Sequence, residues 1–141
     1  MQKNNKQAGF TLIELLVVIA IIGLLSTLAV VALNNARMKA RDARRISDVK
    51  QTQTALELYY NDANGYPASL TFATGTVANG STTYMAVLPS NPAPRADGGC
   101  ANVDYVYAQN TAASYSLTYC LGGDTGGIVA GTHTATPSGL R

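Results

Sequence analysis

Glu14 is the side chain whose position in this sequence most needs a chemical reason. It is an acid within an almost wholly apolar run, residues 10–33. A carboxylate near the centre of a membrane-spanning helix costs roughly 2.5–3.5 kcal/mol to insert, and somewhat less near an end. An ionisable group in such a segment predicts a partner of opposite charge. The alternative is a chance acid at the end of an ordinary signal anchor, drawn toward the lipid headgroups.

Two cysteines, Cys100 and Cys120, lie in the polar C-terminal part of the chain. An even count in a small domain predicts a disulfide if the domain faces an oxidising compartment, and the alternative is two free thiols. The sequence has a single histidine, His133. Because zinc usually needs four close ligands, a zinc site is not expected.

Asp124, in the glycine-rich segment 122–127, is a weak candidate ligand for calcium. Calcium takes about six to eight oxygen ligands and usually more than one carboxylate, so a flexible glycine loop is the preferred interpretation. We find no nucleophile-base-acid set, phosphate-binding loop or metal-ligand cluster in the sequence. We therefore expect neither an enzyme nor a cofactor.

Basic residues gather in residues 37–50, where six of them stand against two acids. Three interpretations remain open for this stretch: a solvated helix face, contact with acidic lipid headgroups, or contact with acidic groups of a neighbouring subunit. Specific nucleic-acid binding is not expected, because the overall charge is only +2. The eight tyrosines are expected to pack in a sheet core with their hydroxyls at its rim rather than to carry electrons.

A single long helix is expected to position Glu14. Residues 10–33 exceed the roughly twenty residues needed to cross a bilayer, and residues 34–64 continue the helix with no proline or glycine. The second half is amphipathic, with one apolar face made of Ile46, Val49, Leu56 and Tyr60. The helix is expected to stop at residues 64–67, with Gly65 as a left-handed cap before Pro67.

Residues 65–141 are expected to form a small β-rich head. Segments 82–88, 104–108 and 114–121 contain β-forming residues between turn signals, and they predict a small antiparallel sheet. So few short strands need an apolar partner, which the amphipathic helix face provides. Residues 122–141 are expected to be loop or a flexible tail. The predicted fold class is α+β, in one domain.

The order of the N-terminal elements is unusual for a secreted protein. A secretory signal peptide has its apolar region before the cleavage site, whereas here the basic leader, residues 1–9, precedes the apolar run. A cut between Gly9 and Phe10 would leave the helix on the mature chain. Residues 9–23, GFTLIELLVVIAIIG, resemble the class III leader and N-methylation segment of type IV pilins and type II secretion pseudopilins.

The resemblance continues as far as residue 92. Residues 41–48, 55–60 and 65–67 are similar to the helix and helix exit of major pseudopilins. Residues 88–92, LPSNP, resemble the Leu-Pro-x-Asp-Pro turn of that group, with Asn91 where aspartate is usual. The remainder of the chain resembles the family poorly.

The resemblance implies a pilin-like fold and a structural filament subunit. It implies that prepilin peptidase cuts after Gly9, that Phe10 becomes the methylated N-terminus, and that Glu14 pairs with the corresponding amine of a neighbouring subunit. Glu14 would thereby set the axial register of assembly. The implied partners are copies of the same chain, prepilin peptidase, an inner-membrane assembly platform, minor pilins and membrane lipid.

The implied location is the inner membrane, with the N-terminus cytoplasmic and the head outside, and afterwards a pilus or pseudopilus. More positive charge follows the apolar run than precedes it, which the positive-inside rule disfavours and pilin-like export would have to override. The alternative of another class is a monomeric membrane-anchored binding module. The helix exit favours a pseudopilin, whereas the weak calcium loop and the cysteine pair favour a pilin, so the machine stays open, as does major versus minor subunit.

Overall fold

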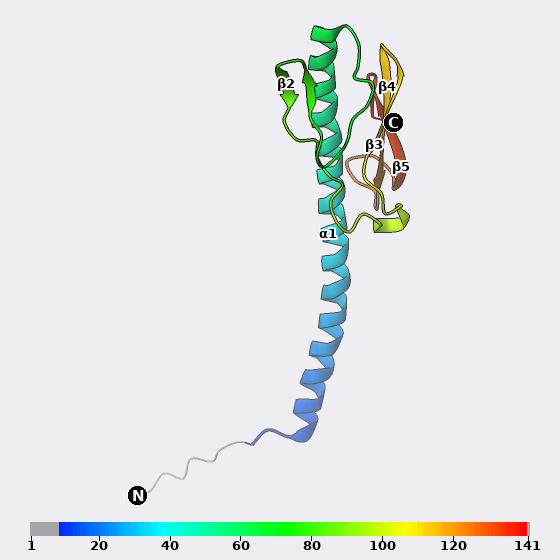
Figure 1. The fold of residues 1–141 in the computed structure, drawn as a ribbon. Coiled ribbons are helices and arrows are strands. Elements are labelled where there is room, and N and C mark those ends of the chain that lie inside the picture. Colours follow the sequence, from blue (N-terminus) through cyan, green and yellow to red (C-terminus); the bar gives the residue numbers. More distant parts are fainter. Residues whose placement is uncertain (1–8, 141) are drawn as a thin grey trace, which may run out of the picture. The chain divides into compact units, whose positions relative to one another are not determined.

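A computed structural model of the chain describes residues 9–140. The chain divides into two compact units, Met1–Ala36 and Arg37–Arg141, and we describe each by itself. Helix α1, Leu12–Ala63, begins in the first unit and ends in the second (Figure 1). Two antiparallel sheets follow it in the second unit. The predicted α+β architecture, a long N-terminal helix packed on a small antiparallel sheet, is confirmed.

The described part of the first unit is mainly the apolar half of α1. Every large hydrophobic side chain from Phe10 to Leu33 is exposed. An 18-residue window of α1 has a mean hydropathy of 2.9, and none of it is buried. By length and composition, this helix can cross a membrane.

In the second unit, α1 presents the predicted apolar face. Val49 and Leu56 are buried, and Ile46 and Tyr60 are partly buried against them. The end of the helix differs from the prediction, because Asn64 rather than Gly65 adopts the left-handed conformation, with a φ of 53°. Asparagine tolerates this region better than other residues with a side chain.

The larger sheet contains four strands in the order β3-β4-β5-β6: β3 (Val106–Thr111), β4 (Ser114–Leu121), β5 (Gly131–Thr136) and β6 (Gly139–Leu140). The segment predicted at 114–121 is β4, and the one predicted at 104–108 begins later, at Val106. Along β4, alternate residues are buried: Tyr115, Leu117, Tyr119 and Leu121. Together with Val49 and Leu56 of α1 they form the main core.

The expectation of loop or a flexible tail at residues 122–141 is wrong for residues 131–140, which contain β5 and β6, whereas residues 122–130 lie outside the strands. β5 pairs with the central strand β4 from Leu117↔Ala135 to Leu121↔Gly131, and β6 pairs with the end of β5. Only Ala135 of β5 is buried. Backbone pairing with β4 therefore orders a segment that contributes little apolar surface, and its composition hides the strand.

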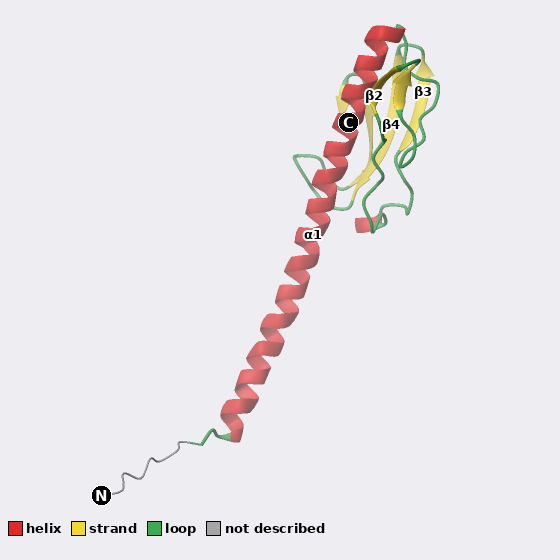
Figure 2. Cartoon of the chain, turned by 60° about the vertical axis from the view of Figure 1, so that its left-hand side comes forward, coloured by secondary structure: helices red, strands yellow, loops and turns green. Residues whose placement is uncertain are grey.

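A two-stranded hairpin, β1 (Val77–Asn79) and β2 (Thr82–Met85), is the second sheet. Its two-residue turn begins with Gly80 at a φ of 58°, as a type II′ turn requires. The segment predicted at 82–88 ends as a strand at Met85, although Leu88 is buried with Val77 and Ala55. The hairpin and the four-stranded sheet thus contact different faces of α1 (Figure 1), and Figure 2 shows the strands of the second unit beside the C-terminal part of α1.

Candidate functional site

The junction between Gly9 and Phe10 lies just before helix α1 and is open to solvent. Phe10 is 85% exposed, and a Cβ added at Gly9 would meet no described atom within 4 Å. The fold of the described residues therefore does not require a glycine at this position. A requirement for a small residue here would have to come from another molecule that acts on the junction. The rest of the predicted leader, residues 1–8, lies outside the described residues.

Glu14 has a local partner that the sequence analysis missed. Its Oε2 accepts hydrogen bonds from the backbone N–H of Thr11 at 2.8 Å and from the Thr11 hydroxyl at 2.7 Å. In return, the N–H of Glu14 donates to Thr11 Oγ1 at 3.3 Å. This is a capping box, which satisfies backbone N–H groups at a helix start. The Thr-x-x-Glu spacing at residues 11–14 is the sequence signal for this capping box.

The capping box occupies only one side of the carboxylate. Both Thr11 donors bind Oε2, and within residues 9–140 no group donates a hydrogen bond to Oε1. A carboxylate oxygen can accept more than one hydrogen bond. Glu14 can therefore close the helix start and still accept a donor from another molecule.

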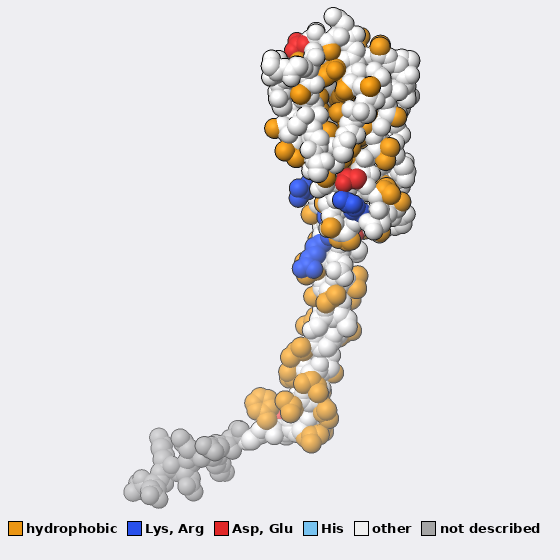
Figure 3. All heavy atoms as spheres, in the orientation of Figure 1, with side chains coloured by type: hydrophobic (Ala, Val, Ile, Leu, Met, Phe, Trp, Pro, Cys, Tyr) orange, Lys and Arg blue, Asp and Glu red, His pale blue; other side chains and the backbone are white. Residues whose placement is uncertain are grey.

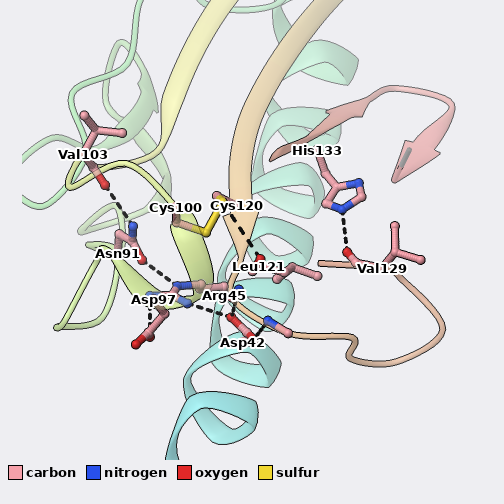
Figure 4. Close-up of a disulfide and its surroundings, with 12 residues drawn as sticks. Asp42, Arg45, Asn91, Asp97, Cys100, Val103, Cys120, Leu121, Val129 and His133 are labelled. Atoms are coloured by element: carbon pink, nitrogen blue, oxygen red, sulfur yellow. Dashed lines mark hydrogen bonds and ion pairs between the residues drawn. A yellow bond between two sulfur atoms is a disulfide. The ribbon is translucent and has the colours of Figure 1, made fainter. Parts of the chain in front are cut away.

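Two charged side chains of residues 37–50 are fully buried, Arg45 and Asp42. Arg45 is fully buried, so for this residue a solvated or partner-facing role is wrong. Its Nη1 donates to Asp42 at 2.6 Å, and its Nε donates to Asn91 Oδ1 at 2.8 Å (Figure 4). Its Nη2 binds the Pro94 carbonyl and Asp97, both at 3.1 Å. Buried guanidinium groups need this degree of satisfaction, and the loops supply it.

Asn91 also explains the departure from the aspartate usual at this turn. It accepts from Arg45 through Oδ1 and donates through Nδ2 to the Val103 carbonyl at 2.9 Å. An ionised aspartate accepts hydrogen bonds but cannot donate them. The amide is therefore the side chain that links both neighbours.

Asp42 and Asp97 are the acidic groups that bind the arginines of this cluster. Asp42 is fully buried and accepts from Arg45 and from the backbone N–H groups of Gly122 and Gly123, at 3.0 and 2.9 Å. Asp97 accepts two bonds from Arg41, at 2.6 and 2.8 Å. The Arg41 guanidinium holds the pKa of Asp97 below its usual value. The cluster joins α1 to two loops of the second unit.

Cys100 and Cys120 form a disulfide with a Cα–Cα distance of 5.8 Å, next to this cluster (Figure 4). The bond connects the loop after the short helix η1, Asp97–Gly99, to β4. Asp124 accepts the N–H of Ala130 at 2.8 Å and so supports its own loop. Among residues 9–140, no group of three or more His, Cys, Asp or Glu side chains is placed to hold a metal ion.

The tyrosines lie mainly in the core, but not every hydroxyl lies at its rim as expected, because the hydroxyls of Tyr115 and Tyr119 are buried. The Tyr105 hydroxyl donates to Asp48 at 3.1 Å, and the Tyr66 hydroxyl donates to Glu57 at 2.7 Å. Burial raises the pKa of Asp48 despite this hydrogen bond, and it raises the pKa of Tyr105 as well. These groups pack the head.

Comparisons with known proteins match the N-terminal segment most clearly. Residues 4–30 match the family described as the prokaryotic N-terminal methylation motif. The chain is 41% identical over 69 residues to the type II secretion system core protein G of Escherichia coli. This match covers 49% of this chain and 48% of that protein. It is 42% identical over 69 residues to the core protein G of Aeromonas hydrophila, with the same coverage.

A further relative matches a longer part of the chain. The chain is 35% identical over 119 residues to a fimbrial protein of Dichelobacter nodosus, which covers 78% of this chain and 72% of that protein. By contrast, the chain spans about half the length of the core G proteins that it matches. No solved structure matches the chain significantly.

Proposed function

Because the chain belongs to the family of type IV pilins and type II secretion pseudopilins, we propose that it is a structural subunit that assembles into a helical filament through residues 10–33. The observation that carries the proposal is the exposed apolar helix with a carboxylate in its first turn. Such a surface is stable only in lipid or against other apolar helices. The proposed role is structural and not catalytic, as the names of its relatives indicate.

We further propose that prepilin peptidase removes residues 1–9 and that Phe10 is then methylated. Two features support this: the match to the methylation motif and the exposed Gly9–Phe10 junction, where nothing in the described fold explains a glycine. Gly9→Val should leave the precursor unprocessed in the membrane. Mass spectrometry of the wild-type mature chain should give Phe10 as the N-terminus, and another N-terminus would refute the assignment.

Glu14 is proposed to pair with the N-terminal amine of a neighbouring subunit and so to set the axial register. Two opposite charges in a low dielectric attract strongly, and any other register leaves both unpaired. Since Glu14 also caps the helix through Thr11, variants must separate these two roles. Glu14→Val removes both the charge and the cap, whereas Glu14→Gln retains a capping-box acceptor and loses the charge.

The register role predicts that Glu14→Gln and Glu14→Val both insert and are processed but give few filaments. Thr11→Val, which removes the hydroxyl of the capping box but leaves the charge, should assemble better than either. Filament yield by electron microscopy and crosslinking between helices measure the result. If Glu14→Gln assembles normally while Thr11→Val does not, the carboxylate serves as a cap only.

The proposal places the subunit in the inner membrane before assembly, with the N-terminus cytoplasmic and the head outside. An oxidising compartment around the head is consistent with the Cys100–Cys120 disulfide. Partners would be copies of the chain, prepilin peptidase, an assembly platform and minor pilins. A monomeric anchored module would instead retain its leader and give no crosslinks between helices.

Relatives with names of both kinds match the chain, so the proposal covers a surface pilus and a secretion pseudopilus. Electron microscopy of cells with and without the gene, combined with a secretion assay, separates the two machines. Loss of long surface fibres with normal secretion indicates a pilus. Loss of secretion without loss of fibres indicates a pseudopilus.

A further inference from the structure

An open pocket of about 600 Å³ lies in the second unit, beside the buried Arg45 cluster. Three arginines line it, Arg41 and Arg44 from α1 and Arg95 from the loop that follows β2, together with the Ser90 to Ala93 segment. None of its lining residues is acidic. The blue side chains in Figure 3 show how basic groups gather on this unit. The pocket is therefore suited to an anion.

The three arginines differ in how far their charge is already balanced. Arg41 binds Asp97 through two hydrogen bonds, and Arg95 binds Asp104 at 3.1 Å. The Nε of Arg44 is 4.0 Å from Oδ2 of Asp48, which is long for an ion pair, and the Arg44 side chain is 67% exposed. Such a long exposed contact contributes little. Arg44 is thus the arginine of the pocket whose charge is least compensated.

Each guanidinium also retains unused donors. Arg41 and Arg95 bind their partners through Nε and Nη2, so Nη1 of each donates to no described atom. Arg44 donates no hydrogen bond within the part of the chain that the structure describes. The planar fork of N–H groups on arginine matches the geometry of a phosphate. Phosphate oxygens therefore suit this pocket better than a halide or a single carbonyl.

The pocket begins a short distance beyond the apolar run. Ala40, its first lining residue, is seven positions after Leu33, and all residues between them are helical. At the standard helical rise this is about 10 Å, and the side chains on a helix lean back toward its N-terminus. The polar headgroup region is roughly 5–7 Å thick on each side of the hydrocarbon core. Arg41 and Arg44 follow eight and eleven positions after Leu33, and their long side chains extend back toward that region.

We propose that the pocket binds the phosphate of an anionic phospholipid headgroup while residues 10–33 span the bilayer. The proposal rests on the membrane insertion contained in the proposed function. A net negative headgroup is preferred over a zwitterionic one, because the residues that line the pocket include three arginines and no acid. The pocket would hold the subunit at a fixed depth before it enters a filament.

The test uses the full chain in bilayer nanodiscs with equal amounts of phosphatidylglycerol and phosphatidylcholine. Native mass spectrometry of the released protein gives the ratio of the two lipids that stay bound. We expect Arg44→Gln to lower the preference for phosphatidylglycerol by more than the roughly fivefold effect of general attraction between one basic residue and an anionic surface, because it also removes donors to the headgroup within the pocket. Lys39→Gln is the matched control, since it removes the same charge closer to the apolar run but outside the pocket.

Lys39→Gln should change the ratio by less than Arg44→Gln. Equal effects of the two variants, or no preference in the wild type, would overturn the pocket and show general electrostatic attraction at most. Displacement of the lipid by millimolar glycerol phosphate would assign the site to a soluble phosphate and also overturn the proposal. Near-ultraviolet circular dichroism of the tyrosines verifies that Arg44→Gln leaves the head folded.

Insertion of the chain into the membrane is measured separately, by the resistance of the protein to alkaline extraction. A wild-type chain that is extracted would refute both membrane insertion and the lipid site. A chain that resists extraction but binds both lipids equally would refute the lipid site alone and leave the filament proposal intact.

Discussion

Asp42→Asn should remove a large part of the stability of the head. Asp42 is fully buried; its Oδ1 accepts from Arg45 and Gly122, and its Oδ2 accepts from Gly123. Asparagine can place its side-chain oxygen where Oδ1 accepts from Arg45 and Gly122. Its NH2 group then takes the place of Oδ2 and faces the N–H of Gly123, so two donors oppose each other. The substitution also removes the closer of the two ion pairs of the buried Arg45, at 2.6 Å, and leaves the one with Asp97 at 3.1 Å. Removal of one partner of a buried pair costs about 3–5 kcal/mol.

A loss of that size is a large fraction of the roughly 5–15 kcal/mol that stabilises an ordinary domain. At about 4 °C or more per kcal/mol for a domain of this size, the melting temperature should fall by at least about 12 °C. Urea unfolding of the full chain in detergent, followed by near-ultraviolet circular dichroism of the tyrosines, measures the free energy of unfolding. The sequence has no tryptophan, so the tyrosines are the natural probe.

The matched control is Asp62→Asn, the same chemical change at an exposed aspartate that accepts a hydrogen bond from the Tyr84 hydroxyl. We expect no comparable loss for this variant, because exposed polar contacts contribute little. If Asp42→Asn destabilises the chain no more than Asp62→Asn does, the buried cluster does not stabilise the head and the reasoning is wrong.

Three further predictions concern the head. Replacing Cys100 and Cys120 together by serine should lower the free energy of unfolding by about 3 kcal/mol, as expected for a loop closed across 20 residues, and an unchanged urea midpoint would contradict this. Gly98→Ala should destabilise more than Gly80→Ala. Both have φ near +55° to +58°, but only at Gly98 does the new Cβ overlap a backbone carbonyl, so equal urea midpoints would exclude a steric effect. Because burial raises the pKa of Asp48, the native state holds its proton more tightly than the unfolded chain, and stability should fall as the pH rises through the folded-state pKa. Asp48→Asn should flatten that fall at pH values above the usual pKa of aspartate, and an identical profile in urea titrations would count against it.

The local patterns in the sequence predicted the elements that they determine. Helix α1 follows from a long stretch of helix-forming residues, and its observed end at Ala63 is close to the expected one. Strand β4 has the predicted bounds because four large side chains alternate on one face. In both cases the information lies within a few neighbouring positions, so periodicity is enough to find it.

The features that were missed depend on distant parts of the chain. Arg45 lies in a basic stretch and looks like a solvated residue, but its burial depends on Asn91, 46 residues away, and on other loop acceptors. Asp42 likewise accepts a hydrogen bond from the backbone N–H of Gly122, which lies 80 residues later in the sequence. Strand β5 likewise forms because β4 lies beside it and not because of its own composition. No local pattern carries such information.

The capping box at Glu14 was a different kind of miss. Its Thr-x-x-Glu signal is local and was present in the sequence, but the acid was interpreted only as a charge that needs a partner. The structure adds a second role to the same side chain without excluding the first.

The one-sided use of the Glu14 carboxylate bears on how subunits would enter and leave a filament. Since the threonine holds Oε2 alone, an incoming amine can take the other oxygen without melting the first helical turn. The same helix conformation then serves the free and the assembled subunit, so the exchange of a neighbour involves no refolding step. Under the proposed function, growth and shortening of the filament would follow the same local path in opposite directions, and the machinery would need only to move the helix along its axis.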